Sequence, residues 1–276
     1  MKLLFDQFSS RASKIITDSY STSFSLGILY INKRIRGDIY AIYGFVRIAD
    51  EIVDSFEGYD KKTLLENFKT ETWEALDKRI SVNPILNSFQ KTVHDYNIRY
   101  ELIEVFFQSM EMDLKKINYD DKKYEQYILG SAEVVGLMCL HVFTENNNET
   151  YEELKPFAMK LGSAFQKVNF LRDLKDDFHL LGRTYFPNLN LMEFTVQAKK
   201  QIEQDIERDF AMALPGIKKL PPSSRTGVYL AYIYYLSLFN KIKRLPVTGL
   251  LNKRVRINNG KKLSLMFNSL LQIKWA

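Results

Sequence analysis

Apolar residues recur at three- and four-residue steps along most of the chain, which is the spacing of one face of an α-helix. One such stripe comprises Ile39, Ile42, Val46, Ala49, Val53 and Phe56. The periodicity predicts helices over 5–54 (with a break near Asn32), 102–114, 124–143, 151–178, 192–214 and 224–243. Polar or Pro-containing segments separate them at 83–84, 145–150, 182–190 and 221–222. Neither a low-complexity linker nor an internal repeat interrupts the pattern, so we predict one all-α domain over 1–276.

The composition narrows the chemistry that this predicted bundle can perform. Only 12 Gly and 7 Pro occur in 276 residues, which argues against a loop-rich or all-β fold. A single cysteine, Cys139, rules out a structural disulfide within the chain, and with only three histidines a Cys/His zinc site is not expected. The numbers of Ser, His and Asp residues do not exclude a Ser-His-Asp triad, but no Gly-x-Ser-x-Gly motif suggests one. Carboxylate, amide and cation chemistry remain.

The net charge of +6 fits a nucleic acid, an anionic membrane surface or a phosphate-bearing small molecule. No nucleic-acid signature accompanies the charge, and the basic stretch 253–262 lacks interleaved aromatics, so we assign that stretch to a solvated or membrane-facing segment and expect no nucleic-acid partner. The longest apolar run, 227–239, is shorter than the about 20 residues that cross a bilayer. With no signal peptide at 1–10, we expect a cytoplasmic protein with peripheral contact at the inner face of the membrane.

Two short acidic segments carry the candidate chemistry. Asp50 and Asp54 are four residues apart, so their carboxylates lie on one face of a helix, beside the apolar stripe. The second segment places four polar side chains on one face by the same stepping: Gln166, Asn169, Asp173 and Asp177. A lone Asp-x-x-x-Asp pair is most often a solvated face. Two such pairs beside apolar positions, on two helices of one bundle, instead favour a shared function.

Divalent cations explain why like charges are placed one turn apart. Such a pair destabilises an isolated helix by about 0.2–0.5 kcal/mol, which a bound ion would offset. Mg²⁺ takes oxygen ligands and is typically held by one or two carboxylates together with substrate phosphates. Arg47 and Arg172, within one turn of the aspartates, are placed to neutralise phosphate oxygens. The pattern therefore predicts Mg²⁺ and a diphosphate between two helices.

At these residues the chain resembles the squalene/phytoene synthase family. Residues 41–54 are similar to its first aspartate helix and residues 162–177 to its second, with order and spacing retained over roughly 15–245. Further matches are the early Ser-x-Ser-Phe segment at 21–24, a mid-chain helix at 127–136 and the loop at 182–187. The chain departs from the family at Tyr20 and Thr22, where basic residues or His are common, and at 247–249, where many members have Tyr.

The resemblance implies an isoprenoid-synthase helical bundle with a central cavity, and it implies a role for each matched residue. A cluster of two or three Mg²⁺ ions would be held by Asp50, Asp54, Asn169, Asp173 and Asp177. The four aspartates and Tyr127 would be the catalytic residues. Substrate would be bound by Ser21, Ser23, Phe24, Tyr43, Arg47, Gln166, Asn169, Arg172 and Arg183. For the aromatic residues core packing is a competing interpretation, and close helix packing is the one we favour for Gly136 and Gly162.

The implied activity is head-to-head (1'-1) condensation of two prenyl diphosphates. The chain length matches bacterial carotenoid-pathway members, so we expect two geranylgeranyl diphosphates to give phytoene through prephytoene diphosphate, without NADPH. A squalene or dehydrosqualene synthase that uses farnesyl diphosphate is the close alternative. Class I terpene cyclases and head-to-tail synthases rank lower, since their usual Asp-Asp-x-x-Asp order is not reproduced at 50–54. A non-catalytic lipid-binding or assembly protein of this fold would be expected to have lost its acid pairs, which are intact here.

Overall fold

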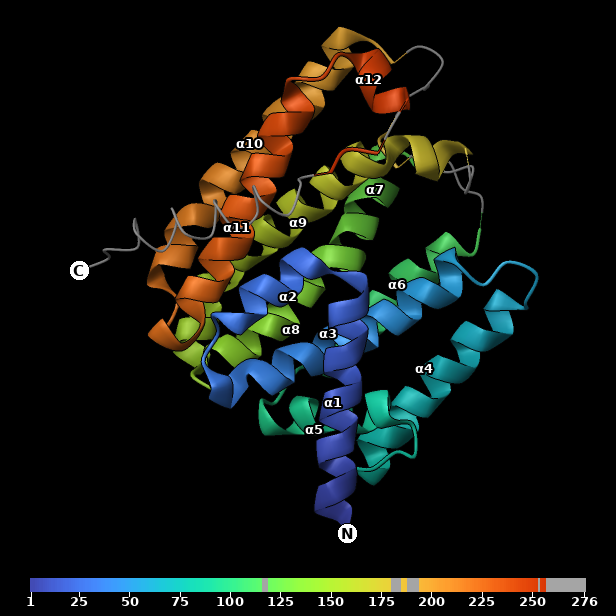
Figure 1. Cartoon of the computed structure of the whole chain (residues 1–276), viewed down its shortest axis with the longest axis vertical. Helices are drawn as coiled ribbons and strands as arrows, with labels where there is room; N and C mark the ends of the chain where they lie inside the picture. The colour runs from blue at the N-terminus through green and yellow to red at the C-terminus, as the bar shows by residue number, and fades with distance from the viewer. Residues whose placement is uncertain (116–118, 180–184, 188–193, 253, 257–276) are drawn as a thin grey trace.

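The computed structural model describes residues 1–115, 119–179, 185–187, 194–252 and 254–256, with the side chains at 22, 23 and 176–179 outside that description. Every regular element in these ranges is a helix, which confirms the predicted all-α class (Figure 1). The helices are α1 (Lys2–Tyr20), α2 (Thr22–Leu29), α3 (Lys33–Asp54), α4 (Lys61–Lys78), α5 (Pro84–Asp95), α6 (Tyr100–Asp113), α7 (Asp121–Ile128), η1 (Leu129–Glu133), α8 (Val134–Phe143), α9 (Asn148–His179), α10 (Val196–Lys219), α11 (Pro222–Lys243) and α12 (Val247–Asn252).

Side-chain caps explain where the N-terminal helices begin. The Asn32 side chain accepts a hydrogen bond from the Arg34 amide at 3.0 Å, and α3 starts there, as the predicted break near Asn32 requires. Ser21 caps α2 in the same way by accepting from the Phe24 amide at 3.1 Å. The sequence pattern did not predict this break at Ser21, because it placed only one interruption, near Asn32, within 5–54. Phe56 was also expected on the helical stripe, but it follows the end of α3 and is exposed.

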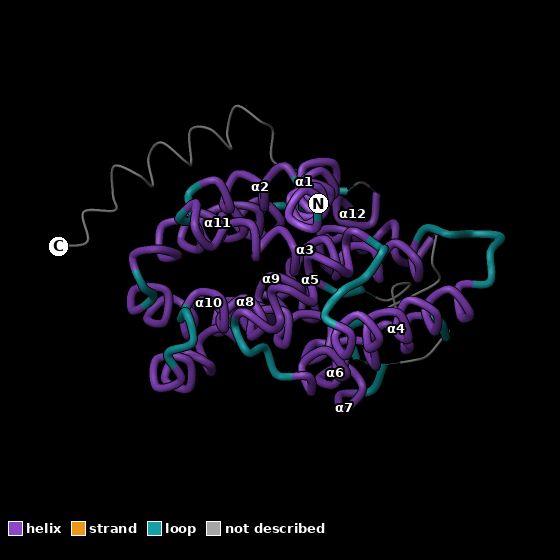
Figure 2. Tube along the Cα trace, turned by 90° about the horizontal axis from the view of Figure 1, so that it is seen from below, coloured by secondary structure: helices purple, strands orange, loops and turns teal. Residues whose placement is uncertain are grey.

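Two clusters of buried apolar side chains hold the helices together. In the N-terminal half, Phe45 of α3 stacks on Phe89 of α5 at 3.9 Å between ring centroids and packs against Phe106 and Phe107 of α6. In the C-terminal half, α9 packs along α10 and α11 over a second aromatic cluster that includes Phe210. Figure 2 shows α1, α2 and α11 along one side of this assembly, opposite α4, α6 and α7.

The run Asp121–Phe143, which comprises α7, η1 and α8, crosses the middle of the molecule. By length and composition it could span a membrane, but most of its apolar window is buried against other helices, as expected of a core helix. Close packing here depends on glycine, because a Cβ at Gly162 of α9 would lie 2.6 Å from the Ala132 carbonyl oxygen. At Gly136 the corresponding distance to the Ala158 carbonyl oxygen is 3.1 Å. Both glycines therefore serve close helix packing, as we favoured from the sequence.

Candidate active site

Asp50 lies near the C-terminal end of α3 in surroundings that disfavour its charge. The pKa of its carboxyl is raised to about 8, chiefly by burial and next by the neighbouring charge of Asp54, whereas Arg47 acts to lower it. The two carboxylates one turn apart thus repel one another in a partly desolvated site. A positive ligand placed between them would relieve both the repulsion and the desolvation.

Arg47 is positioned one turn before Asp50 on the same helix. Its guanidinium forms an ion pair with Glu51 and lies over the ring of Tyr20, 4.2 Å from the centroid. This stacking gives Tyr20, one of the departures from the family pattern, a defined role in holding the arginine. The buried Nε atom of Arg47 has no hydrogen-bond partner within the described part of the chain. An unused buried donor beside two aspartates suits an anionic oxygen such as that of a phosphate.

The residues expected around the start of α2 form a small aromatic group. Phe24 stacks on Tyr43 of α3 with the ring centroids 5.1 Å apart. The Ser21 hydroxyl, which caps α2, is also hydrogen-bonded to Tyr43, whose pKa rises to about 12 chiefly because of burial. The predicted Ser23 side chain lies outside the described residues. Phe24 and Tyr43 therefore adjoin the first acid motif from the side of α2.

The second acid motif is in a different electrostatic state from the first. Asp173 of α9 accepts hydrogen bonds from Arg172, at 2.9 Å from Nε to Oδ1, and forms an ion pair with Arg254 at 2.7 Å. Arg254 belongs to the basic stretch that was expected in solvent or against a membrane, and its side chain is exposed while it pairs with Asp173. Asn169 Nδ2 donates to Gln166 Oε1 at 3.4 Å. The side chain of Asp177 and all of Arg183 lie outside the described residues.

Tyr235 of α11 links the two motifs. Its hydroxyl donates to Asn169 Oδ1 at 3.4 Å, and its ring stacks on Phe165 at 4.0 Å. Burial chiefly raises the pKa of Tyr235, and the charge of Asp173 adds to that rise. Tyr235 in turn contributes to the raised pKa of Tyr43 on α3. One phenol is therefore within electrostatic reach of both polar faces, as expected if they border one site.

A second link runs through Asp113 at the end of α6, a residue that the sequence analysis missed. Its buried carboxylate accepts hydrogen bonds from Tyr127 at 2.6 Å and from Tyr185 at 3.1 Å, and it adds to the raised pKa of Asp50. The Tyr185 ring stacks at 4.2 Å on Phe170, the residue after Asn169 of the second motif. Asp113 continues the buried helical positions of Phe106 and Met110, and an acid on an apolar stripe is the signal that could have identified it.

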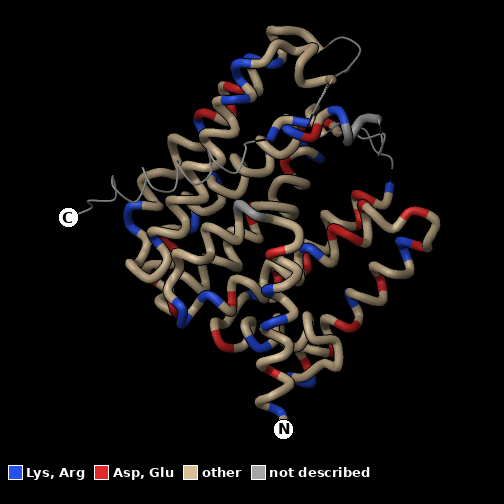
Figure 3. The backbone as a smooth tube through the Cα atoms, viewed as in Figure 1, with Lys and Arg blue, Asp and Glu red and all other residues tan. Residues whose placement is uncertain are grey.

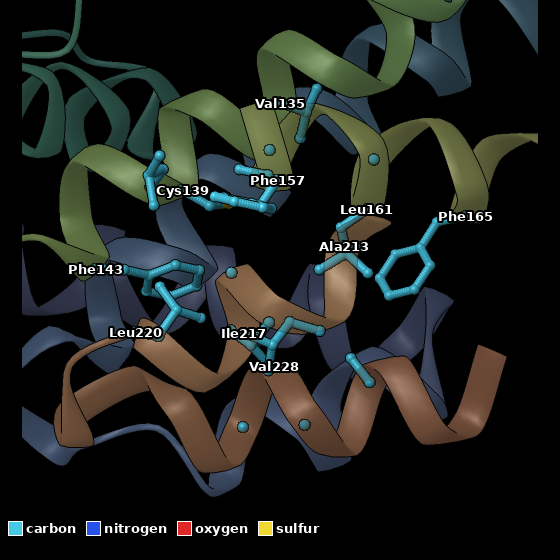
Figure 4. A pocket seen from close by; sticks show the side chains of 18 of the residues that line it. Val135, Cys139, Phe143, Phe157, Leu161, Phe165, Ala213, Ile217, Leu220 and Val228 are labelled. Atoms are coloured by element: carbon cyan, nitrogen blue, oxygen red, sulfur yellow. The ribbon is translucent and has the colours of Figure 1, made fainter. Parts of the chain in front are cut away.

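A cavity of about 220 Å³ extends from this region into the helical bundle. Phe24, Phe165 and Gln166 are among its lining residues, so the cavity adjoins the second acid motif. The rest of its wall is almost entirely apolar, and Figure 4 shows side chains from α8, α9, α10 and α11 converging on it. Such a cavity suits a hydrocarbon chain and excludes water from it.

The described side chains fit a divalent cation only in part. No group of three or more His, Cys, Asp or Glu side chains gathers in metal-binding geometry within the described ranges. The pair Asp50 and Asp54 nevertheless supplies hard oxygen donors whose charges need compensation. Asp177, a further predicted ligand, belongs to the undescribed side chains. The donor set of the first motif thus suits Mg²⁺.

Comparison with known proteins identifies a matching family model and several similar chains. A family model described as squalene/phytoene synthase matches residues 17–261. The chain is similar to 4,4'-diapophytoene synthase of Staphylococcus haemolyticus, with 24% identity over 90% of this chain and 91% of that protein. It is 28% identical to the chloroplastic phytoene synthase of an Oncidium hybrid cultivar over 90% of this chain, but it spans only 64% of that protein. A crystal structure of a dehydrosqualene synthase with a bound ligand superposes with a TM-score of 0.85 at 19% identity, covering 98% of both chains.

Proposed function

Because the chain belongs to the squalene/phytoene synthase family, whose members join two prenyl diphosphates head to head, we propose that it condenses two geranylgeranyl diphosphates to phytoene through prephytoene diphosphate. The observation that carries this proposal is the junction of two features. A pair of mutually repelling carboxylates with an unused arginine donor lies on α3, and an apolar cavity reaches toward that helix through Phe24, which lines the cavity and stacks on Tyr43, one turn before Arg47. These features suit the two ends of one substrate, a metal-bound diphosphate and a hydrocarbon tail.

Five residues would hold a cluster of two or three Mg²⁺ ions: Asp50, Asp54, Asn169, Asp173 and Asp177. Ions bound there would supply Lewis acidity, neutralising the diphosphate so that its allylic C–O bond can ionise. The Nε atom of Arg47 and the guanidinium of Arg172 would donate to phosphate oxygens.

The aromatic residues have a different task in this proposal. Phe24 lines the cavity, and its ring can stabilise an allylic cation without attacking it. Tyr127, which packs behind the second acid motif against Phe170, would add to that stabilisation. The apolar cavity wall would keep water from quenching the cation to an alcohol. Asp113, which accepts a hydrogen bond from the Tyr127 hydroxyl, would fix the orientation of that ring. Catalysis would then depend on the orientation of the aromatic rings and on the exclusion of water as much as on the charges that bind the diphosphate.

The expected substrate is the C20 diphosphate. Several of the similar curated proteins are phytoene synthases, which supports this choice, whereas 4,4'-diapophytoene synthase supports a related C15 reaction. We accordingly keep a squalene or dehydrosqualene synthase that uses farnesyl diphosphate as the second candidate.

The test is incubation of the purified chain with geranylgeranyl or farnesyl diphosphate and Mg²⁺, with and without NADPH. Phytoene formed without NADPH is the expected result, and the Asp50→Asn variant should form none. Squalene that appears only with NADPH would select the second candidate. Failure of the folded protein to release diphosphate from either substrate would overturn both and favour a lipid-binding protein of the same fold.

A further inference from the structure

The first helix has its polarity reversed relative to an ordinary surface helix. The side chains of α1 that are fully buried against α3 and α5 are small and polar, namely Ser9, Ser13 and Thr17. The opposite face of α1 carries large apolar side chains. Leu4, Phe8 and Ile15 are 71%, 55% and 65% exposed, and Leu3 beside them is 71% exposed. A helix normally turns such residues inward, so this outward stripe needs an explanation.

The inward face of α1 is fixed by specific contacts. Ser13 Oγ lies 2.6 Å from Ser88 Oγ of α5, and Ser9 accepts a hydrogen bond from Asn87 Nδ2 at 3.1 Å. A Cβ at Gly44 of α3 would lie 3.2 Å from the Ser13 side chain, so the two helices are close. Rotating α1 to bury its leucines would break these hydrogen bonds and place side chains too large for the close α1–α3 interface. These inward contacts therefore keep the apolar stripe on the outer face.

Basic charge accompanies the apolar stripe. Arg11 is exposed and falls between Phe8 and Ile15 on the outer face of the helix. Within the described residues Arg11 forms no ion pair, whereas Lys14, also exposed, pairs with Asp18 on the same helix. Charged positions are interspersed along α1 (Figure 3), and the whole chain carries a net charge of +6. An apolar stripe with flanking basic side chains is typical of helices that lie in an anionic membrane interface.

The stripe is also well placed relative to the candidate active site. Only Ser21 separates α1 from α2, and α2 contributes Phe24, Gly27 and Ile28 to the cavity wall. The helices α1, α2 and α11 lie along one face of the molecule, toward the viewer in Figure 1 and at the top of Figure 2. A bilayer that met α1 would therefore lie on the same side as two of the helices that enclose the cavity.

We propose that the outer face of α1, defined by Leu3, Leu4, Phe8, Arg11 and Ile15, docks the protein on an anionic lipid bilayer. A stable contact with a second protein buries about 800 Å² on each partner, contributed by 20–30 residues. Four large apolar side chains on one helix fall short of that, but they suffice to insert into the interface of a membrane. The reason for such docking rests on the proposed function, since both substrate and product would be hydrophobic. The docking itself needs no substrate.

The test compares binding of the full chain to sedimenting vesicles of phosphatidylcholine with and without phosphatidylglycerol. The variant Leu4→Ser/Phe8→Ser/Ile15→Ser should bind about 1,000-fold more weakly, because burying each of the three side chains changes a transfer equilibrium by about tenfold. Arg11→Gln should weaken binding about fivefold on the anionic vesicles alone.

A matched control removes exposed apolar side chains elsewhere. Val82, Val196 and Met212 are 95%, 76% and 53% exposed, and none lies on α1. The variant with serine at all three positions should bind vesicles like the unmodified chain. Since every substituted side chain is exposed, thermal melts should be unchanged in both triple variants, which separates loss of binding from loss of folding.

Three outcomes would overturn the inference. The first is that the unmodified chain does not bind anionic vesicles. The second is that the α1 triple variant binds them as tightly as the unmodified chain. The third is that the unmodified chain binds no vesicles but forms a concentration-dependent dimer in sedimentation, which the α1 substitutions abolish. Activity on prenyl diphosphates in detergent micelles is measured separately. An active enzyme that ignores vesicles refutes only the docking, whereas an inactive chain that binds them refutes only the proposed function.

Discussion

Replacing Asp50 with Asn should stabilise the metal-free protein at alkaline pH. The pKa of Asp50 is raised from an ordinary value of 3.8 to about 8, first by burial and then by Asp54. Between these two values the folded protein keeps a proton that the unfolded chain has lost. The stability associated with the protonated carboxyl is therefore fully present below pH 4 and is lost progressively as the pH rises to about 8. The Asp50→Asn substitution removes this pH-dependent loss of stability, because the asparagine side chain does not ionise.

The magnitude follows from the size of the shift. At about 1.36 kcal/mol per pKa unit, the full shift sets a ceiling of about 6 kcal/mol. Asp50 retains some contact with solvent, and its surroundings can relax around the charge, so we expect about 2–3 kcal/mol. The Asp50→Asn variant should thus exceed the unmodified chain by that amount in free energy of unfolding at pH 8.5. At pH 4 the two proteins should be nearly equal.

Denaturant titrations in EDTA at pH 4, 6 and 8.5 measure these differences. The control is Asp77→Asn, an exposed aspartate on α4, for which the difference should stay near zero at every pH. Adding Mg²⁺ with inorganic pyrophosphate at pH 8.5 should reverse the order, because only the unmodified site would bind them with both carboxylates. If Asp50→Asn proves no more stable than the unmodified chain at pH 8.5 in EDTA, the ionised carboxylate costs the fold nothing and the reasoning fails.

Three further predictions concern packing, acid stability and catalysis. Gly162→Ala should lower the free energy of unfolding by about 1–3 kcal/mol, because its Cβ would meet a backbone carbonyl. Gly37→Ala, whose Cβ would have an ordinary 3.5 Å contact, should not lower it; denaturant midpoints compare the two. Burial lowers the pKa of His141 to about 4, so its neutral form supports the fold above pH 6.5 and that support is lost as the pH falls toward 4. As the pH falls from 6.5 to 4, the free energy of unfolding of His141→Phe should therefore decrease by about 1–3 kcal/mol less than that of the unmodified chain. Melts recorded across this pH range measure the difference. Asp113→Asn should lower kcat at least about tenfold with helicity retained, and an unchanged kcat would remove its role in positioning Tyr127.

The helices could largely be predicted because their signals are local. The stripe along α3, the cap at Asn32 and Pro84 at the start of α5 all act within one or two turns. The break at Ser21 escaped prediction because apolar spacing continues across it, and a single capping hydroxyl decides the boundary. Likewise the run over 124–143 reads as one helix, although it contains the π-helical turn η1.

The site was predictable only where its residues share a helix. The repeat of Asp50 and Asp54 can be read from spacing, as can the polar face that carries Asn169 and Asp173. Asp113 and Arg254 escaped because their significance depends on contacts across 72 and 81 residues, with Tyr185 and Asp173. No periodicity records a contact between distant segments, so such partners emerge only from the fold.

These distant partners give the two acid motifs unequal roles. Asp173 is already neutralised by Arg172 and Arg254, so a cation that bound there would have to displace two guanidinium groups. Asp50 is less well compensated, since the guanidinium of Arg47 lowers the pKa of Asp50 but is also paired with Glu51, and this pKa stays at about 8. The free energy that a divalent cation gains is therefore greatest at the first motif. The arginines at the second motif lie where an incoming diphosphate would draw them away from the carboxylate. In the proposed reaction, the first motif would bind metal before the second, and substrate would complete the second.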